Sequence, residues 1–196
     1  MLKIILVRHG ETENNCDGLY CGWNDIFLTE KGLMQAKKVS EKLKEENFDY
    51  IISSDLDRTM KTAEIINQYH HVEIILESNI REMNFGLWEG LSYKEIKEKY
   101  PKEVKEWEND WIDYVTPNGE SVKQMYERVT KAIDKIIHKN KRGNILIVAH
   151  AGSIRAILAY LIGRGMKDYW KYKIDNCGIC IIEIIDKFPV LTALNQ

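Results

Sequence analysis

Four short runs of aliphatic residues constrain the fold of this chain more than any other feature. They occupy residues 2–7, 50–52, 144–149 and 179–185, and Ile, Val and Leu dominate them. A strand with one face in water alternates apolar and polar residues, and these runs do not alternate in that way. We therefore predict strands that are buried on both faces, in a sheet that is mostly parallel. Residues 72–76 are a candidate for a further strand.

Segments with helical periodicity separate the predicted strands. Apolar residues at positions 33, 36, 39 and 43 form one face of a helix that follows Thr29, which is a suitable N-cap. Further helices are predicted over Leu56–Tyr69, from Ser121 to about His138, and over Ser153–Leu161. This alternation predicts an α/β fold with helices on both faces of the sheet. A chain of 196 residues is long enough for one domain with a full core.

The stretch from residue 86 to about residue 125 differs in composition, because it is rich in Lys and Glu. Ser92 and Glu95 form a capping-box pattern that starts a short helix, and Pro101 ends that helix or begins the next one. We predict a small helical insertion within the domain. The aromatic residues of interest here are Trp88, Tyr93, Trp107 and Trp111. They form either a wall over an organic leaving group or the insertion's own core.

Composition and charge argue against several classes of partner. The formal net charge is −2, so the chain has no basic excess with which to hold a nucleic-acid backbone. The apolar run before Arg8 is too short for a signal peptide, and His150 and Arg155 interrupt the longest apolar region, so we expect no membrane contact. Cys177 and Cys180 lack partners for a zinc site, and we interpret them as structural. The four cysteines fit no disulfide framework, which indicates a cytoplasmic protein.

Two of the five histidines occur in equivalent positions. His9 and His150 each follow a predicted buried strand, and a glycine comes one or two residues later. Ligands of open α/β sheets bind beyond the carboxyl ends of the strands, so both histidines should face one site. Arg8 precedes His9, and Arg58 lies in the first turn of a predicted helix, where the helix N-terminus favours anions. Together these residues predict an anion pocket that suits a phosphate.

Four sequence blocks resemble the signature blocks of the histidine phosphatase superfamily, also called the phosphoglycerate-mutase-like family. The blocks are LVRHGETENN, SSDLDRTMKTAEII, REMNFGLWEG and VAHAGSIRAIL, and they occur in the family's order over most of the chain. The resemblance implies a phosphoglycerate-mutase-like fold and an enzyme with a phosphohistidine intermediate. One departure is Phe27, where the family commonly has proline, and it concerns the path of the local loop rather than the chemistry.

The resemblance also implies a role for each matching residue. His9 corresponds to the nucleophile that becomes phosphohistidine, and Glu82 corresponds to the acid that protonates the leaving oxygen. The other implied site residues are Arg8, Arg58 and His150 in the phosphate pocket, with Asn15, Cys21, Gly22 and Ala151 as further phosphate- or substrate-binding residues.

The expected chemistry is also reasonable from the residue types alone. A neutral imidazole is nucleophilic without a base to remove a proton, and flanking arginines disfavour the imidazolium form of His9. The same arginines stabilise the charge on the phosphoryl oxygens during transfer. Glu82 can give a proton to the leaving oxygen and recover one from water. We expect neither a metal nor another cofactor.

The blocks leave hydrolysis and isomerisation open. Mutases of this family place basic residues directly after the catalytic glutamate, whereas Met83 and Asn84 are neutral. The FGLWEG block resembles α-ribazole-phosphate phosphatases of cobalamin assembly and broad-specificity phosphatases. We therefore expect a phosphatase that acts on a small phosphomonoester such as α-ribazole 5′-phosphate, with a homodimer as a candidate assembly.

Two alternatives accompany this expectation. Phosphoglycerate mutase is the first, and it is favoured by the insertion's lysines at positions 94, 97, 99, 102 and 105, which could instead form a solvated helix face. A non-catalytic module that binds phosphorylated ligands is the second. The full set of catalytic residue types argues against a module.

Overall fold

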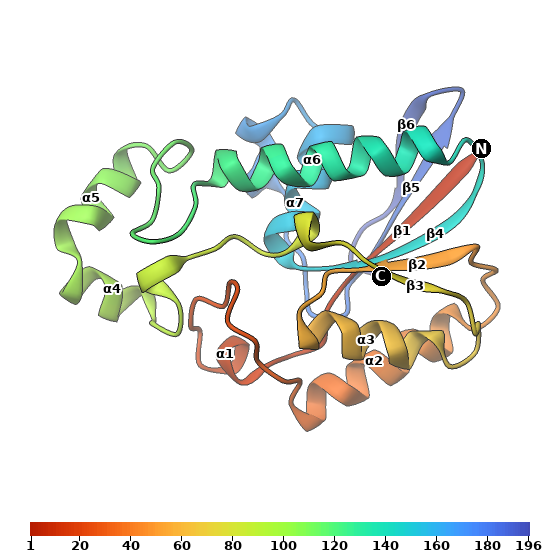
Figure 1. Ribbon diagram of the computed structural model, residues 1–196, viewed down its shortest axis with the longest axis horizontal. Coiled ribbons are helices and arrows are strands. Elements are labelled where there is room, and N and C mark those ends of the chain that lie inside the picture. The colour runs from red at the N-terminus through yellow and green to blue at the C-terminus, as the bar shows by residue number, and fades with distance from the viewer.

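The aliphatic runs form strands of one six-stranded sheet in the computed structural model, which describes residues 1–196 (Figure 1). The strands are β1 (Leu2–Arg8), β2 (Tyr50–Ser53), β3 (Ile74–Leu76), β4 (Gly143–Ala149), β5 (Ile179–Ile185) and β6 (Phe188–Ala193). Their order is β3-β2-β4-β1-β5-β6, and the first four are parallel, which confirms the mostly parallel sheet. β5 is antiparallel to both of its neighbours, β1 and β6. β6 is not among the predicted strands. It contains Pro189, and a proline argues against a central strand but is tolerated at a sheet edge, which is where β6 lies.

The predicted helices are present, with small differences at their ends. The helices are α1 (Glu13–Cys16), α2 (Glu30–Leu43), α3 (Asp57–Asn67), α4 (Tyr93–Lys99), α5 (Pro101–Asn109), α6 (Val122–Lys139) and α7 (Ala151–Leu161), with short 3-10 helices η1 (Ser78–Ile80), η2 (Gly86–Trp88) and η3 (Met166–Lys171). Thr29 caps α2 by accepting a hydrogen bond from the Gly32 N–H. Ser92 and Ser121 form the predicted capping boxes of α4 and α6. α7 begins two residues earlier than expected, directly after His150.

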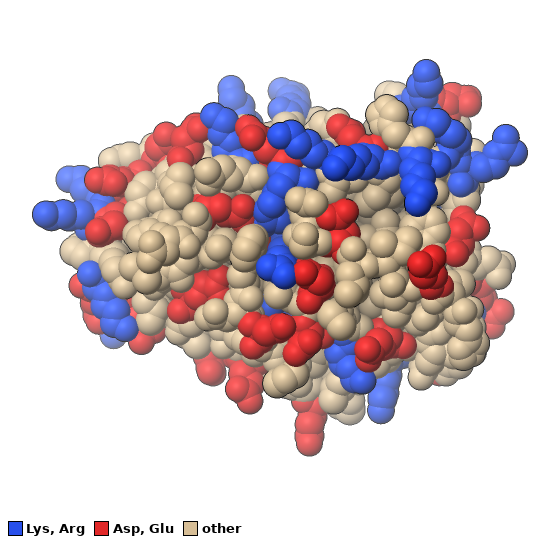
Figure 2. Space-filling model, in the orientation of Figure 1, with Lys and Arg blue, Asp and Glu red and all other residues tan.

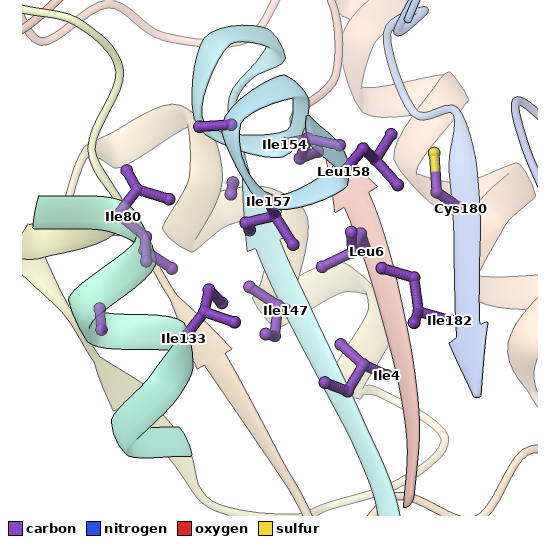
Figure 3. Close-up of a cluster of buried hydrophobic side chains, with 14 of the residues drawn as sticks. Ile4, Leu6, Ile80, Ile133, Ile147, Ile154, Ile157, Leu158, Cys180 and Ile182 are labelled. Carbon is purple, nitrogen blue, oxygen red and sulfur yellow. The ribbon is translucent and has the colours of Figure 1, made fainter. Parts of the chain in front are cut away.

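Helices cover both faces of the sheet, as Figure 1 shows, with α6 and α7 on one face and α2 and α3 on the other. Neighbouring residues of one strand therefore enter different cores. Ile145 and Ile147 of β4 pack with α6 and α7, in the cluster drawn in Figure 3, whereas Leu146 and Val148 pack with α2 and α3. This double burial explains why the strands lack a polar face in the sequence.

The segment 86–125 has a small core of its own. Trp88, Ile96 and Val104 are buried together, and Trp107 packs against them. Trp88 and Trp107 thus belong to the insertion's core, whereas Trp111 packs against aromatic residues of η3. α4 and α5 lie at one end of the molecule (Figure 1). We propose that this segment is an insertion within a single domain.

Two further observations concern the chain as a whole. No helix in the structure combines the length and the apolar character needed to cross a membrane. Cys177 and Cys180 are buried, free thiols that belong to cores on opposite faces of the sheet. Packing therefore accounts for both residues without a shared function.

Candidate active site

The parallel register of β1 and β4 brings two functional residues to one edge of the sheet. Arg8 of β1 pairs with Ala149 of β4, so the next residues, His9 and His150, leave the two strands side by side. Their imidazole ring centroids lie 5.2 Å apart. β2 ends beside β4, and its following residue Ser54 also reaches this edge. The structure therefore brings together the two histidines that the sequence singles out.

Hydrogen bonding fixes the tautomer of His9. Its Nδ1 lies 2.7 Å from the carbonyl oxygen of Gly10, which can only accept, so Nδ1 carries the proton. Nε2 of a neutral His9 is then left with its lone pair free. His150 differs, because its Nε2 lies 2.9 Å from the hydroxyl of Ser54. Ser54 is a site residue that the sequence analysis missed, since only the strand pairing relates it to His150.

The environment keeps both imidazoles neutral. Burial lowers the pKa of His9 and of His150 well below 6.5, and the positive charges of Arg58 and Arg8 lower both further. His9 is 4% exposed and His150 is completely buried. A buried neutral imidazole beside two guanidinium groups can act as a nucleophile or a hydrogen-bond donor at pH 7.

The two arginines are held by backbone carbonyl groups. Arg8 donates from Nη1 to Ile174 O at 2.8 Å. Arg58 is completely buried and donates to Gly22 O at 2.5 Å and to Asn24 O at 3.0 Å. These bonds fix the positions of both guanidinium groups without neutralising their charge.

Three buried nitrogen atoms on the side chains around His9 have no hydrogen-bond partner in the protein. They are Nε of Arg8, Nε of Arg58 and Nδ1 of His150. Leaving a buried donor unpaired costs about 1–3 kcal/mol, so a cluster of such atoms is unfavourable in isolation. An oxyanion such as a phosphoryl group matches their number and the positive charge of the two arginines.

Glu82 lies in the irregular segment between η1 and η2, and its side chain turns toward α7. Oε2 accepts a hydrogen bond from the Gly152 N–H at 2.9 Å, and Oε1 accepts one from the Met83 N–H at 2.9 Å. Gly152 is the second residue of α7, so this N–H is one that the helix leaves unbonded. The first turn of α7 thus joins Glu82 to the strand end that carries His150.

Gly152 is a second residue whose importance the sequence analysis missed. A Cβ atom at this position would lie 2.0 Å from Oε1 of Glu82 and 2.8 Å from the hydroxyl oxygen of Tyr169. No side chain fits there without displacing the carboxylate. The available signal was a glycine in the first turn of a helix, where glycine is intrinsically unfavourable.

The remaining predicted residues lie around the same pocket. Asn15 accepts from the side-chain amide of Asn176, which also donates to the carbonyl of His9. Gly22 accepts from Arg58, as described above, and Ala151 is the first residue of α7. Cys21 is half-buried, and burial raises the pKa of its thiol. All of the residues predicted for the site are therefore close to the strand ends or to their direct contacts.

The expected anion site at the start of α3 needs a correction. The N–H of Asp57, the first residue of α3, donates to the carboxylate of Asp25 at 2.7 Å. The protein's own Asp25 carboxylate therefore occupies this helix N-terminus. Arg58 contributes through its side chain, which extends to the Gly22–Asn24 loop.

Comparisons with known proteins find relatives that match nearly all of this chain. A phosphoserine phosphatase 1 from Hydrogenobacter thermophilus is 33% identical over 195 residues, which cover 100% of this chain and 92% of that protein. The crystal structure of an alpha-ribazole phosphatase from Shigella flexneri has a TM-score of 0.94 at 31% identity, over 99% of this chain and 96% of that one. A protein named "Probable phosphoglycerate mutase GpmB" from Escherichia coli O1:K1 is 33% identical over 183 residues, which cover 93% of this chain and 85% of that protein.

The family model described as the histidine phosphatase superfamily (branch 1) matches residues 4–196. The match covers β1 from residue 4 onward and the whole of the other five strands, including the edge strand β6. The chain belongs to the histidine phosphatase superfamily.

Proposed function

We propose that the protein hydrolyses phosphomonoesters through a phosphohistidine formed on Nε2 of His9. The observation that carries this proposal is the hydrogen bond from Nδ1 of His9 to Gly10 O, 2.7 Å long, in a ring whose pKa is lowered by burial and by two arginines. The bond leaves the Nε2 lone pair available at neutral pH. No base is needed to activate a nucleophile of this kind.

In the first step, Nε2 of His9 bonds to phosphorus while the bond from phosphorus to the ester oxygen breaks. Glu82 gives its proton to that oxygen, so the alcohol leaves neutral. Arg8, Arg58 and His150 donate to the three equatorial oxygens, whose charge is stabilised without reorganisation of the protein. The unpartnered nitrogen atoms on these three side chains support this assignment.

In the second step, water takes the phosphoryl group from His9. Glu82, now ionised, removes a proton from the attacking water, and the bond from phosphorus to Nε2 breaks. The products are free phosphate and a regenerated neutral imidazole. This cycle needs no metal ion, because the two arginines supply the positive charge.

The structure changes the argument about hydrolysis against isomerisation. The neutrality of Met83 and Asn84 is not informative, because Met83 is buried in the core and the Asn84 side chain accepts from the Gly86 N–H. The five lysines of the insertion are all exposed, as expected for a solvated face. Hydrolysis is supported by two relatives that are named as phosphatases. The relative named as a mutase favours isomerisation as the second candidate.

For the substrate, we propose α-ribazole 5′-phosphate first and phosphoserine second. The TM-score of 0.94 to the Shigella flexneri phosphatase supports the first, and the Hydrogenobacter thermophilus relative supports the second. A non-catalytic module would not need a proton donor, so the presence of Glu82 beside the histidines supports an enzyme.

The test is a panel of phosphomonoesters with release of free phosphate as the readout. Brief incubation with labelled substrate, followed by an alkaline quench, should trap phosphate that is bound covalently to the protein. The label should map to His9. The variant His9→Ala should lose both the label and turnover. Activity that persists in this variant would refute the mechanism, and formation of 2-phosphoglycerate faster than phosphate release would favour the mutase.

A further inference from the structure

The segment that carries Glu82 has no helix or strand to hold it. η1 ends at Ile80 and η2 begins at Gly86, so residues 81–85 between them have no ladder of backbone hydrogen bonds. A proton donor must nevertheless be held closely, because a misplacement of about 1 Å can cost roughly a hundred-fold in rate. The position of this segment must therefore be set by side chains from other elements.

Arg128 of α6 is one of these side chains. Its Nη1 donates to Asn79 O and to Arg81 O, each at 2.9 Å, and its Nη2 donates to Glu82 O at 2.7 Å. One planar guanidinium thus holds the carbonyl of Glu82 and those of two residues just before it. The ring nitrogen Nε1 of Trp23 donates to the same Glu82 O at 2.8 Å. Glu82 is therefore fixed at its backbone from two directions.

The guanidinium of Arg128 is itself fixed by Glu120. The Glu120 carboxylate accepts from Nε of Arg128 at 3.0 Å and from Nη2 at 2.5 Å, and the two side chains are only 16% and 14% exposed. Glu120 also accepts from the Asn84 N–H at 2.8 Å. One ion pair thus links residues on both sides of Glu82. A planar fork with five donors can do this, whereas an ammonium group cannot reproduce the pattern.

Arg128 differs in this respect from its basic neighbours on α6. Figure 2 shows Lys and Arg side chains gathered along this helix. Lys131 and Lys135 are exposed and form no ion pair, as expected for a solvated helix face. Arg128 is half-buried, and its side-chain hydrogen bonds all go to Glu120 and to the carbonyls of Asn79, Arg81 and Glu82. Its guanidinium also approaches the Trp23 ring at 5.8 Å.

We propose that Arg128 is the positioning residue for Glu82, with Trp23 as the second support. This inference rests on the proposed function, because it assumes that Glu82 transfers the proton. Arg128 would not touch the phosphoryl group, since its hydrogen-bonding nitrogen atoms are all engaged by backbone carbonyls or Glu120. Its loss should therefore impair proton transfer and spare phosphate binding.

The test compares an alkyl phosphomonoester, whose leaving oxygen needs a proton, with p-nitrophenyl phosphate, whose leaving group does not. Because Glu82 also serves the water step that both esters share, the readout is release of the leaving group in a single turnover. In Arg128→Met this rate should fall about a hundred-fold for the alkyl ester and far less for the aryl ester. The ester concentration that gives half of the maximal single-turnover rate should stay near the wild-type value for both esters. Arg128→Lys should be intermediate, and Lys131→Met, on the same helix, should match the wild type.

Trp23→Phe keeps an aromatic ring beside Arg81 and Arg128 but removes the Nε1 donor, so it should show the same selective loss in a milder form. This variant decides the question if Arg128→Met does not fold. Equal losses on the two esters, or no loss on either, would overturn the inference. Wild-type protein that hydrolyses neither ester, or an active His9→Ala variant, would overturn the proposed function and this inference with it.

Discussion

Adding a single methyl group at Gly152 tests whether the placement of Glu82 controls proton transfer. In Gly152→Ala the new Cβ would begin 2.0 Å from Oε1 of Glu82, whereas ordinary contacts of this kind begin at 3.4 Å. The carboxylate must therefore move by more than about 1 Å, a shift that typically costs around a hundred-fold in rate. Its hydrogen bond from the Gly152 N–H, 2.9 Å in the wild type, would be broken or distorted.

The expected result is a loss that depends on the leaving group. Measured as release of the leaving group in a single turnover, the rate for an alkyl phosphomonoester should fall by about a hundred-fold or more, within the range of general acid catalysis. For p-nitrophenyl phosphate the loss in this first step should be much smaller. Overpacking of this kind typically destabilises a fold by about 1–3 kcal/mol, so urea unfolding should show a modest decrease and a single transition.

A double-mutant cycle with Glu82→Gln gives the control. Glu82→Gln already lacks the proton, so adding Gly152→Ala to it should cause little further loss on the alkyl ester. Additive losses in the cycle would show that the methyl group acts by another route. Full activity of Gly152→Ala on the alkyl ester would refute the reasoning altogether.

Three further predictions concern pH, metal ions and the insertion. Because the unfolded chain protonates His9 and His150 near pH 6.5 while the folded chain keeps both neutral, stability should fall as the pH decreases through 6.5, by about 1.4 kcal/mol per histidine at pH 5.5. Urea unfolding at pH 7.5 and pH 5.5 measures this decrease in the free energy of unfolding. In His9→Asn the decrease should be about half as large as the two histidines cause together, and an unchanged decrease would contradict the assignment. Exhaustive dialysis against a chelator should leave phosphatase activity intact, and a loss that Mg²⁺ or Zn²⁺ restores would contradict the proposed cycle. Trp88→Ala should destabilise the insertion by about 3–5 kcal/mol, because Trp88 is 2% exposed, and limited proteolysis should then cut within residues 86–125 before the rest of the chain.

The sequence was sufficient to predict five of the six strands and the location of the two histidines at strand ends, because both follow from local patterns. Uninterrupted aliphatic runs mark strands buried on both faces, and His9 and His150 follow two such runs directly. Parallel pairing then brings the two strand ends together whatever the surrounding helices do. Capping patterns at Thr29 and Ser121 likewise depend on residues within one turn.

The supports of the site could not be predicted, because they depend on contacts between distant segments. Asp25 occupies the start of α3, and Arg128 reaches Glu82 from another element of the fold. Neither contact leaves a periodic or spaced signal in the sequence. Met83 illustrates the same limit, since its lack of charge after Glu82 was an argument for hydrolysis, whereas its side chain is buried in the core.

The position of β1 in the sheet has a consequence for how the protein is made. β1 leaves the ribosome before the other five strands, yet its neighbours are β4 and β5, which begin at Gly143 and Ile179. At about 5–20 residues per second, β1 must wait roughly seven seconds or more for either partner. During that time an apolar strand with two unpaired edges is open to self-association. The site around His9 therefore cannot assemble until β4 has been synthesised. Fragments that end before β4 should be inactive and should need a chaperone to remain in solution.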